Sequence, residues 1–162
     1  MYENKYLTNW QLFFLVFLRV AIGWHFLYEG LVKLFTSSWT SSGFLMDSKG
    51  FLAPFYRSIA SDPETLNIID RLNEWGLILI GLGLILGIFT RLATVAGMIL
   101  LVFYYLSHPP FMGLKYALPS EGSYFIVDKV MIEFLALGVL LVFPTGRIIG
   151  IDRLIFRRKL KD

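Results

Sequence analysis

Four long apolar stretches, separated by polar segments, dominate the pattern of residues along this chain. They cover about residues 10–35, 75–89, 92–106 and 125–143. About 20 helical residues cross the roughly 30 Å of hydrocarbon in a bilayer, and each stretch is long enough for this or nearly so. The pattern therefore predicts an all-α fold, a membrane-embedded antiparallel four-helix bundle, with residues 1–162 forming a single integral membrane domain.

The connection between the second and third stretches consists only of Thr90 and Arg91, which predicts a tight antiparallel hairpin. Glycine is frequent in the second stretch, and the spacing Gly83-x-x-x-Gly87 is typical of membrane helices that approach each other closely. This spacing is common in membrane helices, so it does not identify a particular partner helix.

The two loops at the opposite end of the predicted bundle are longer. The first, about residues 36–73, is rich in aromatic residues, which suits segments that lie in the headgroup zone. Within it, Asp62 and Pro63 indicate the start of a helix, and this helix can continue through Glu74 into the second stretch. The second loop, from His108 to Pro119, contains prolines that exclude a continuous helix.

Composition places the chain outside the range of soluble domains. Hydrophobic residues make up 56% and charged residues 17% of the chain, against about 45–50% and about 25% in soluble globular proteins. The sequence has no cysteine, which excludes disulfides, thiolate metal sites, iron–sulfur ligation by thiolates and CxxC redox pairs. Because there are only two histidines, a zinc site held by this chain alone is not expected.

The distribution of lysine and arginine predicts a multi-pass orientation in the cell inner (cytoplasmic) membrane with both termini cytoplasmic. The inside set is then Lys5, Arg91, Arg147, Arg153, Arg157, Arg158, Lys159 and Lys161, and the outside set is Lys49, Arg57, Arg71 and Lys115. The basic C-terminal tail is expected to lie against anionic lipid headgroups, and nucleic acid is not an expected partner. The first stretch is interpreted as an uncleaved helix, because it is too long for a signal peptide and no small-x-small cleavage site follows it.

Ionisable residues inside the apolar stretches are the candidates for function, because such groups are costly in a bilayer and usually face the bundle interior. His25, Glu29 and Lys33 follow one another at i, i+4 and i+8, and Arg19 shares their face of the first helix. The other helices are expected to add Asn73, Glu74, Tyr104, Tyr105, His108, Asp128, Lys129 and Glu133 to the same layer, in the outward half of the bundle.

The predicted catalytic residues are His25, Glu29 and Glu133, because a histidine beside a carboxylate at low dielectric can titrate near neutrality and pass protons. The predicted cofactor-binding residues are Arg19, Lys33, Glu74, Tyr104, His108 and Lys129. The sequence leaves structural alternatives open: the carboxylates can pair with lysines on their own helices, the lysines can snorkel to the headgroups, and the tyrosines can form an interfacial belt. A haem between His25 and His108 is a further alternative, but Glu29 one turn away disfavours it, and neither metal nor haem is expected.

Several short motifs carry a resemblance to a known family. They are Leu18–Gly23 and Phe26–Leu34 in the first helix, Gly87–Ala93 at the hairpin, Asp128–Phe134 in the fourth helix and Phe143–Leu154 at the C-terminal end. Together and in this order they resemble the DoxX/DoxD family over essentially the whole chain, most closely DoxD, the small subunit of thiosulfate:quinone oxidoreductase. The resemblance implies a quinone-linked membrane subunit, which in some members oxidises thiosulfate together with a second, DoxA-like subunit.

The leading hypothesis is therefore an integral inner-membrane subunit of a quinone-linked oxidoreductase, with quinone as the cofactor and thiosulfate as one candidate electron donor. His25 and Glu29 would accept protons, while Lys33 and Lys129 would supply positive charge to the quinone head group or to an anionic sulfur substrate. The expected partners are the lipid bilayer and a DoxA-like or other oxidoreductase subunit. Whether the chain is itself catalytic, and whether it forms a homo-oligomer, stays open.

Two other classes of function remain. The first is a non-catalytic membrane scaffold or assembly protein that holds a partner envelope protein through its aromatic outer loops. The second is a small transporter or channel for an anion or protons, which the absence of an inverted repeat in the sequence makes the least favoured.

Overall fold

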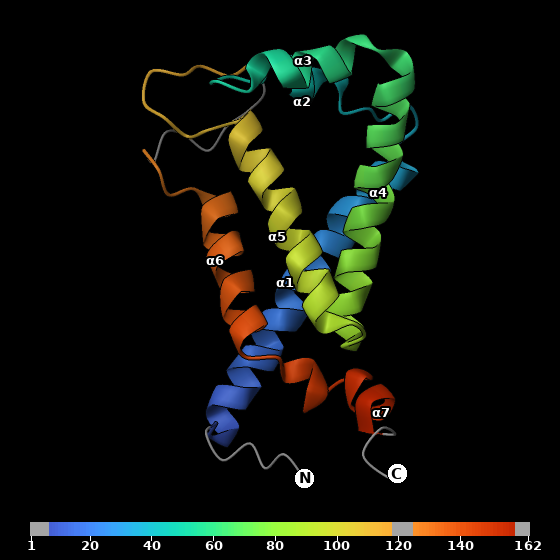
Figure 1. Cartoon of the computed structure of the whole chain (residues 1–162), viewed down its shortest axis with the longest axis vertical. Coiled ribbons are helices and arrows are strands. Elements are labelled where there is room, and N and C mark those ends of the chain that lie inside the picture. The colour runs from blue at the N-terminus through green and yellow to red at the C-terminus, as the bar shows by residue number, and fades with distance from the viewer. Residues whose placement is uncertain (1–6, 118–124, 158–162) are drawn as a thin grey trace.

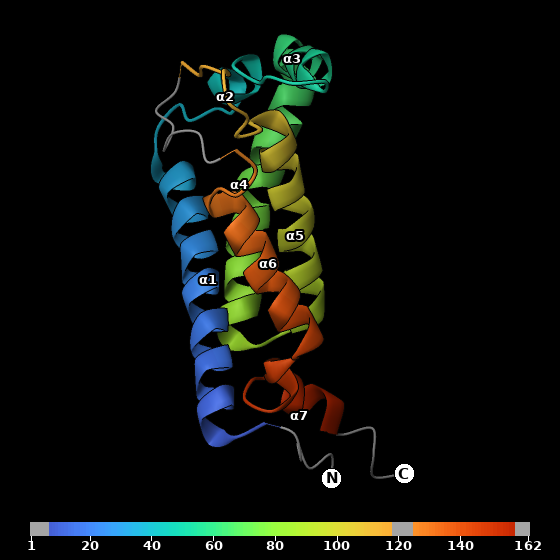
Figure 2. The same cartoon turned by 90° about the vertical axis from the view of Figure 1, so that its left-hand side faces the viewer.

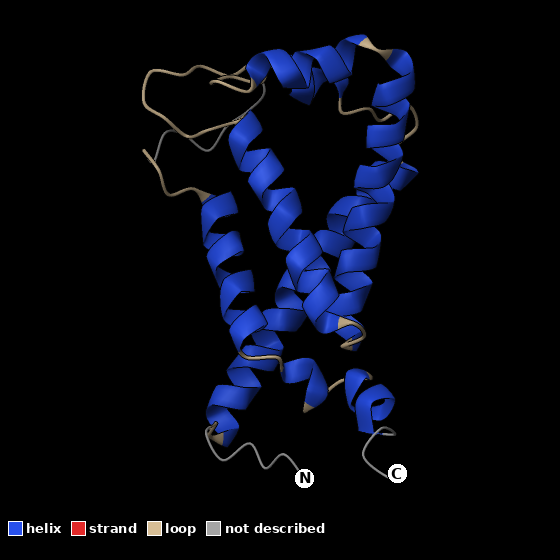
Figure 3. Ribbon diagram, viewed as in Figure 1, coloured by secondary structure: helices blue, strands red, loops and turns tan. Residues whose placement is uncertain are grey.

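The computed structural model describes residues 7–117 and 125–157, which form helices and loops without any strand (Figure 3). The elements are α1 (Asn9–Phe35), α2 (Ser42–Met46), α3 (Ala53–Ser61), α4 (Pro63–Leu86), α5 (Thr90–Ser107), α6 (Lys129–Val142), the short 3₁₀ helix η1 (Thr145–Arg147) and α7 (Asp152–Arg157). The all-α class predicted from the sequence is confirmed for this part of the chain.

The four long helices α1, α4, α5 and α6 run alternately up and down (Figure 1). Helix α1 packs against α4 along most of its length, α5 packs against α6, and α4 joins the two pairs. Helices α2 and α3 lie across one end of the molecule, here called the cap end (Figure 2). The start of α1 lies at the opposite end with η1 and α7, here called the terminal end, and α1 extends past the α4–α5 hairpin there (Figure 2).

Two of these helices, α1 and α5, are long and apolar enough to cross a membrane. Only 22% of the most apolar window of α1 and 33% of that of α5 is buried inside the protein. A core helix of a soluble protein would bury most of such a window, so the apolar side chains on the outside of these helices favour a lipid environment.

The predicted start of the second long helix is confirmed. The Asp62 side chain accepts a hydrogen bond from the backbone N–H of Thr65, Pro63 occupies the first turn, and α4 then continues through Glu74 to Leu86. Helix α6 is shorter than the predicted stretch 125–143. It begins at Lys129, because Asp128 caps it by accepting a 2.8 Å hydrogen bond from Met131 N.

The close approach of α1 and α4 depends on glycines other than the predicted pair. A Cβ atom on Gly81 would lie 2.5 Å from Leu27 N, and one on Gly30 would lie 2.7 Å from Ile78 Cγ1. Gly87 instead ends α4 in the left-handed conformation, with φ of 70°, and so begins the predicted tight hairpin. The connection consists of residues 87–89, and Thr90 and Arg91, which were predicted to form it, lie in the first turn of α5. The interpretation of Gly83-x-x-x-Gly87 as a helix-contact pattern is therefore corrected at Gly87.

The hydrophobic core draws on all four long helices. It contains Ile22, Phe26, Leu77, Ile80, Leu84, Ala93, Leu101, Leu137 and Leu140. Leu84 and Leu137 have no exposed surface at all, so the centre of the bundle is closely packed.

The aromatic residues of the long first loop divide into two groups. Phe51 and Phe55 are 81% and 51% exposed, as expected for the headgroup zone. Tyr56 turns inward and its hydroxyl donates to the carbonyl of Phe103, and Trp39 and Phe44 reach the side chains of the candidate site.

Some residues named in the sequence analysis lie outside the described part of the chain. They are Lys5, Pro119, Arg158, Lys159 and Lys161.

Candidate functional site

The structure places five residues of the predicted polar layer on the cap side of the core, in two hydrogen-bonded groups that we together call the cap-side cluster. It consists of His25, Lys33, Asn73, Tyr104 and Glu133, with one or more residues from each long helix. Its hydrogen bonds join α1 to α6 and α1 to α4 and α5.

His25 and Glu133 connect α1 to α6. His25 Nδ1 and Glu133 Oε1 lie 2.8 Å apart, and the His25 side chain is 53% exposed against 14% for Glu133. The predicted pairing of His25 with Glu29 on the same helix is therefore corrected, because the bonded carboxylate is that of Glu133 on α6. The pair spans a seam where α1 and α6 make few other contacts.

Lys33 is half-buried and held by neutral partners. Its Nζ donates to Asn73 Oδ1 at 3.0 Å and to the Tyr104 hydroxyl at 3.4 Å. It also lies 5.2 Å from the centre of the Trp39 ring and 5.6 Å from that of Tyr104, distances at which a cation interacts with an aromatic face. Lys33 makes no ion pair with a carboxylate among the described residues.

Tyr104 and Lys33 both retain donor capacity. The Tyr104 hydroxyl accepts from Asn73 Nδ2 at 2.6 Å and from Lys33, and its own proton has no acceptor among the described residues. An ammonium group has three N–H donors, and the described acceptors use two of those on Lys33. The cluster can therefore donate two further hydrogen bonds to a bound molecule.

His108 forms a group of stacked rings with Phe44 and Tyr116 next to this cluster, which we call the roof. Its ring stacks on Phe44 at 3.9 Å between centroids, Phe44 in turn contacts the Tyr104 ring edge-on at 5.8 Å, and Tyr116 covers the other side of His108 at 4.7 Å. Burial lowers the pKa of His108 below its ordinary value, while the charge of Asp47 acts to raise it and that of Lys49 to lower it. His108 Nε2 is buried and has no hydrogen-bond partner within the described structure.

The remaining predicted residues surround the cluster. Glu29 is exposed on α1, and its charge acts on His25, Lys33 and Tyr104. Glu74 is half-buried and its charge acts on Lys33, and the charge of Lys129, which is exposed on α6, acts on His25.

Arg19 is not part of this cluster. Its side chain is 3% exposed and lies at the terminal end, where Nη1 donates to Thr145 Oγ1 at 3.1 Å and Nη2 to the Ile149 carbonyl at 2.8 Å. The physical reason is that α1 extends past the hairpin, so that Arg19 lies at the level of Gly87 and is enclosed by the C-terminal segment. The expected shared layer with Lys33 is therefore not formed.

Asp152 completes a second group at this end. Its carboxylate accepts hydrogen bonds from Phe89 N at 2.7 Å, from Thr90 N at 2.9 Å and from the Thr90 hydroxyl. We call Arg19, Thr90, Thr145, Ile149 and Asp152 the terminal cluster. The sequence carried a signal for it in the Thr90-Arg91 hairpin and the Gly150-x-Asp152 end, but the mutual contacts were not predicted.

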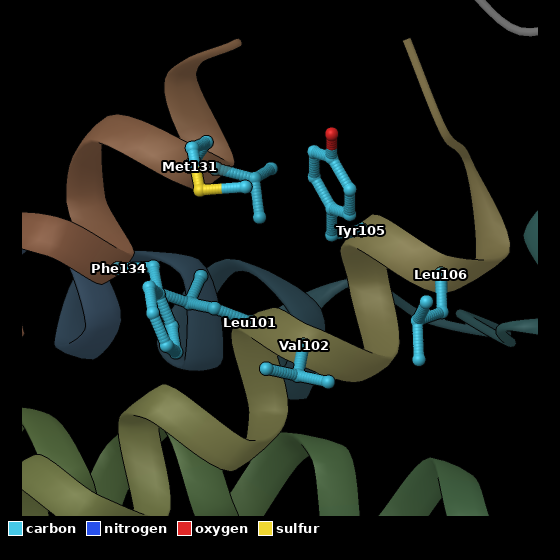
Figure 4. A pocket seen from close by; sticks show the side chains of 7 residues that line it. Leu101, Val102, Tyr105, Leu106, Met131 and Phe134 are labelled. Atoms are coloured by element: carbon cyan, nitrogen blue, oxygen red, sulfur yellow. The ribbon is translucent and has the colours of Figure 1, made fainter. Parts of the chain in front are cut away.

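Two apolar grooves are lined by none of the residues of the two clusters. One, of about 180 Å³, lies between α5 and α6 and is lined by Leu101, Val102, Tyr105, Leu106, Val130, Met131 and Phe134 (Figure 4). The other, of about 450 Å³, lies between α4 and α5. The Tyr105 hydroxyl donates to the Ile126 carbonyl, and neither groove is lined by a charged residue.

Comparison with known proteins gives a family but no individual relative. The sequence model of the DoxX family matches residues 14–109. No curated protein and no solved structure matches the chain.

The matched segment is narrower than the resemblance suggested. It contains Arg19, His25, Lys33, Asn73 and Tyr104, but it ends before α6 and the C-terminal segment. DoxX proteins are membrane proteins, which agrees with the two membrane-length helices α1 and α5. Because the match covers more than half of its length, the chain belongs to the DoxX family.

Proposed function

We propose that this DoxX protein is an integral inner-membrane subunit of a quinone-linked oxidoreductase, with the thiosulfate:quinone type as the first candidate. In this proposal α1, α4, α5 and α6 all cross the membrane as an antiparallel bundle and both termini are cytoplasmic. The exposed Arg91, Arg147 and Arg153 at the terminal end support this orientation, because basic residues are enriched on the cytoplasmic side.

The observation that carries the proposal is the unused hydrogen-bonding capacity of the cap-side cluster. A quinone head group presents two carbonyl oxygens, which accept hydrogen bonds. Lys33 and Tyr104 offer donors without described acceptors, and the His25–Glu133 pair adds a group that can hold a proton. The donor set therefore fits a quinone.

The roles of the residues follow from their positions. Lys33 and Tyr104 would donate to a carbonyl oxygen and orient the head group, while His25 and Glu133 would hold or release a proton at Nδ1 and Oε1. A bound quinone would supply the two-electron redox chemistry. The sequence has neither a thiol nor a dinucleotide-binding motif, so electrons would come directly from the substrate or through a partner subunit.

The contacts of the first loop favour this proposal over the scaffold hypothesis. Trp39 and Phe44 cover Lys33 and Tyr104 of the same chain, so these two aromatic residues have a role without a partner protein. The exposed Phe51 and Phe55 remain available to bind a partner protein. Substitutions at these two positions therefore distinguish the two hypotheses.

The test is quinone binding by purified protein in lipid nanodiscs, with Tyr104→Phe and its matched control Tyr105→Phe. The two tyrosines are adjacent, but the Tyr105 hydroxyl bonds to the Ile126 carbonyl instead of to the cluster. We expect saturable binding of a short-chain ubiquinone, weakened at least about tenfold by Tyr104→Phe, which is about 1.4 kcal/mol, and unchanged by Tyr105→Phe. Equal effects of the two substitutions, or no saturable binding to the wild-type protein, would exclude the proposal.

A further inference from the structure

The two clusters are separated by a layer without any titratable side chain. Residues 20–24 of α1, 75–86 of α4, 92–103 of α5 and 134–142 of α6 contain no Asp, Glu, His, Lys, Arg or Tyr. His25 lies six residues from Arg19 along α1, which corresponds to about 9 Å. No proton-carrying side chain is therefore available in these segments to connect the cap-side cluster with the terminal end.

This layer is also closely packed. Ile22 on α1 is 7% exposed, Thr94 on α5 is 2% exposed, and Leu84 and Leu137 have no exposed surface. Leu137 lies one turn from Glu133 toward the terminal end, directly below the His25–Glu133 pair. The hydroxyl of Thr94 is already used, because it donates to the Thr90 carbonyl at 2.7 Å. The centre of the layer therefore leaves water no space, and the two grooves that border it are lined almost entirely by apolar side chains.

The terminal cluster closes the bundle beneath this layer. A Cβ atom on Gly146 would overlap Thr90 Oγ1, and one on Gly87 in the hairpin would lie 2.7 Å from Gly150 Cα. The C-terminal segment therefore packs with its backbone directly against the hairpin. Such contact leaves no room for a file of water molecules at these positions.

The opposite direction is open. His25 and Glu29 are exposed, and Lys33 is partly exposed. They follow each other at intervals of four residues toward the cap end, about 6 Å per step. Titratable groups thus continue from the His25–Glu133 pair toward the cap and do not continue toward the terminal end.

We propose that the cap-side cluster exchanges protons and water with the compartment on the cap side of the membrane only, and that the apolar layer and the terminal cluster form the seal on the other side. The inference rests on the proposed function in one respect only: the protons are taken to serve quinone reduction. The one-sided access itself does not depend on quinone. In the proposed orientation, proton uptake and release by the cluster take place at the outer face.

The experiment uses single-cysteine variants, because the chain has no cysteine of its own. Glu29→Cys reports on the cluster and Thr94→Cys, nearly equal in volume to the wild type, on the apolar layer. Arg153→Cys, at an exposed position of the terminal end, identifies that side of the membrane. Each variant is treated with a membrane-impermeant, positively charged methanethiosulfonate, added either to spheroplasts or to inside-out vesicles.

We expect Glu29→Cys to react at least about tenfold faster from the side opposite to the one that labels Arg153→Cys, and Thr94→Cys to be unreactive from both sides. Reaction of Glu29→Cys from the same side as Arg153→Cys, its failure to react from either side, or labelling of Thr94→Cys would overturn the inference. Leu137→Cys provides a second probe of the layer if Thr94→Cys does not fold, and its labelling from either side would likewise overturn the inference. Slower labelling of Glu29→Cys in the presence of a short-chain ubiquinone tests the proposed function separately. A failure of the proposed function can therefore be distinguished from a failure of this inference.

Discussion

The terminal cluster and the cap-side cluster both contain polar and charged side chains but differ in how completely the fold encloses them. Arg19 and Asp152 are each 3% exposed, and within the described structure Arg19 Nε is the buried side-chain atom of this cluster that lacks a hydrogen-bond partner. His25 is about half exposed, and Lys33 and Tyr104 retain donors without described acceptors. The first cluster is enclosed by the fold, whereas the second can still bind something.

The two clusters also connect different parts of the chain. The Arg19 side chain reaches Thr145 and Ile149, which lie 126 and 130 residues further along the sequence. It thereby fixes the C-terminal segment to the first helix. The cap-side cluster instead bridges helices that separate toward the cap in Figure 1. Polar residues of membrane helices can thus serve either to hold the fold or to form a site, and in this protein their burial distinguishes the two uses.

The largest predicted effect on stability is that of Asp152→Ala. The substitution leaves two backbone N–H groups and the Thr90 hydroxyl without their acceptor, and each buried unsatisfied group costs about 1–3 kcal/mol. We expect a destabilisation of at least about 3 kcal/mol, measured as a lower thermal midpoint in detergent. The neighbouring exposed Arg153→Ala is the control. Equal midpoints for the two variants would contradict a structural role for the terminal cluster.

A smaller loss is expected from Gly81→Ala, which tests the α1–α4 contact that supports both clusters. The added methyl group would lie 2.5 Å from Leu27 N, so the helices must move apart, at a cost of about 1–3 kcal/mol. Gly138→Ala is the matched control, because its Cβ atom would have no neighbour within 4 Å and alanine favours helix by up to about 1 kcal/mol. We expect a lower thermal midpoint for Gly81→Ala and an equal or higher one for Gly138→Ala. The reverse order would show that α1 and α4 do not pack as described.

Much of the fold could be predicted from local sequence signals. The Asp62-Pro63 start of α4 and the hairpin at Thr90 depend on residues close together in the chain, and both are present in the structure. The extent of the fourth helix was predicted less well, because hydrophobicity continues from Phe125 to Phe143 while the Asp128 cap sets the start of α6 at Lys129. Hydropathy alone does not register such a cap.

The site was predictable in its membership and less so in its pairing. The spacing of His25, Glu29 and Lys33 follows from helix geometry, which is local. The choice of Glu133 as partner of His25 depends on how α1 and α6 cross, and the capture of Arg19 depends on a segment more than a hundred residues away. Neither of these long-range contacts is encoded in the spacing of residues on one helix.

The cap-side cluster should show the opposite balance to the terminal cluster, with a small effect on stability and a large effect on function. Because His25 is half exposed, we expect His25→Ala to cost less than about 1 kcal/mol. Under the proposed function, His25→Ala and Glu133→Gln should each abolish substrate-dependent quinone reduction in membranes, whereas Phe51→Ala should leave it unchanged. Loss of activity in Phe51→Ala with retention in the other two would favour the scaffold hypothesis.

The smallest predicted effect concerns the pH dependence of stability at the roof of the cap-side cluster. Burial lowers the pKa of His108 below its ordinary 6.5 in the folded protein, with the charge of Asp47 opposing this shift and that of Lys49 adding to it. Above pH 6.5 the ring is neutral in both the folded and the unfolded chain, so its contribution to stability is fully present. As the pH falls below 6.5, the unfolded chain takes up a proton that the folded chain resists, and the contribution is lost once the pH falls through the folded pKa.

His108→Gln removes this titration, and comparing its thermal midpoints with those of the wild type between pH 7.5 and pH 5 measures it. We expect the wild-type midpoint to fall more steeply toward acid than that of His108→Gln, with the difference confined to the range below pH 6.5. Parallel curves would mean that protonation of His108 does not destabilise the folded protein. His108 would then have to be hydrated within the stack of Phe44, His108 and Tyr116.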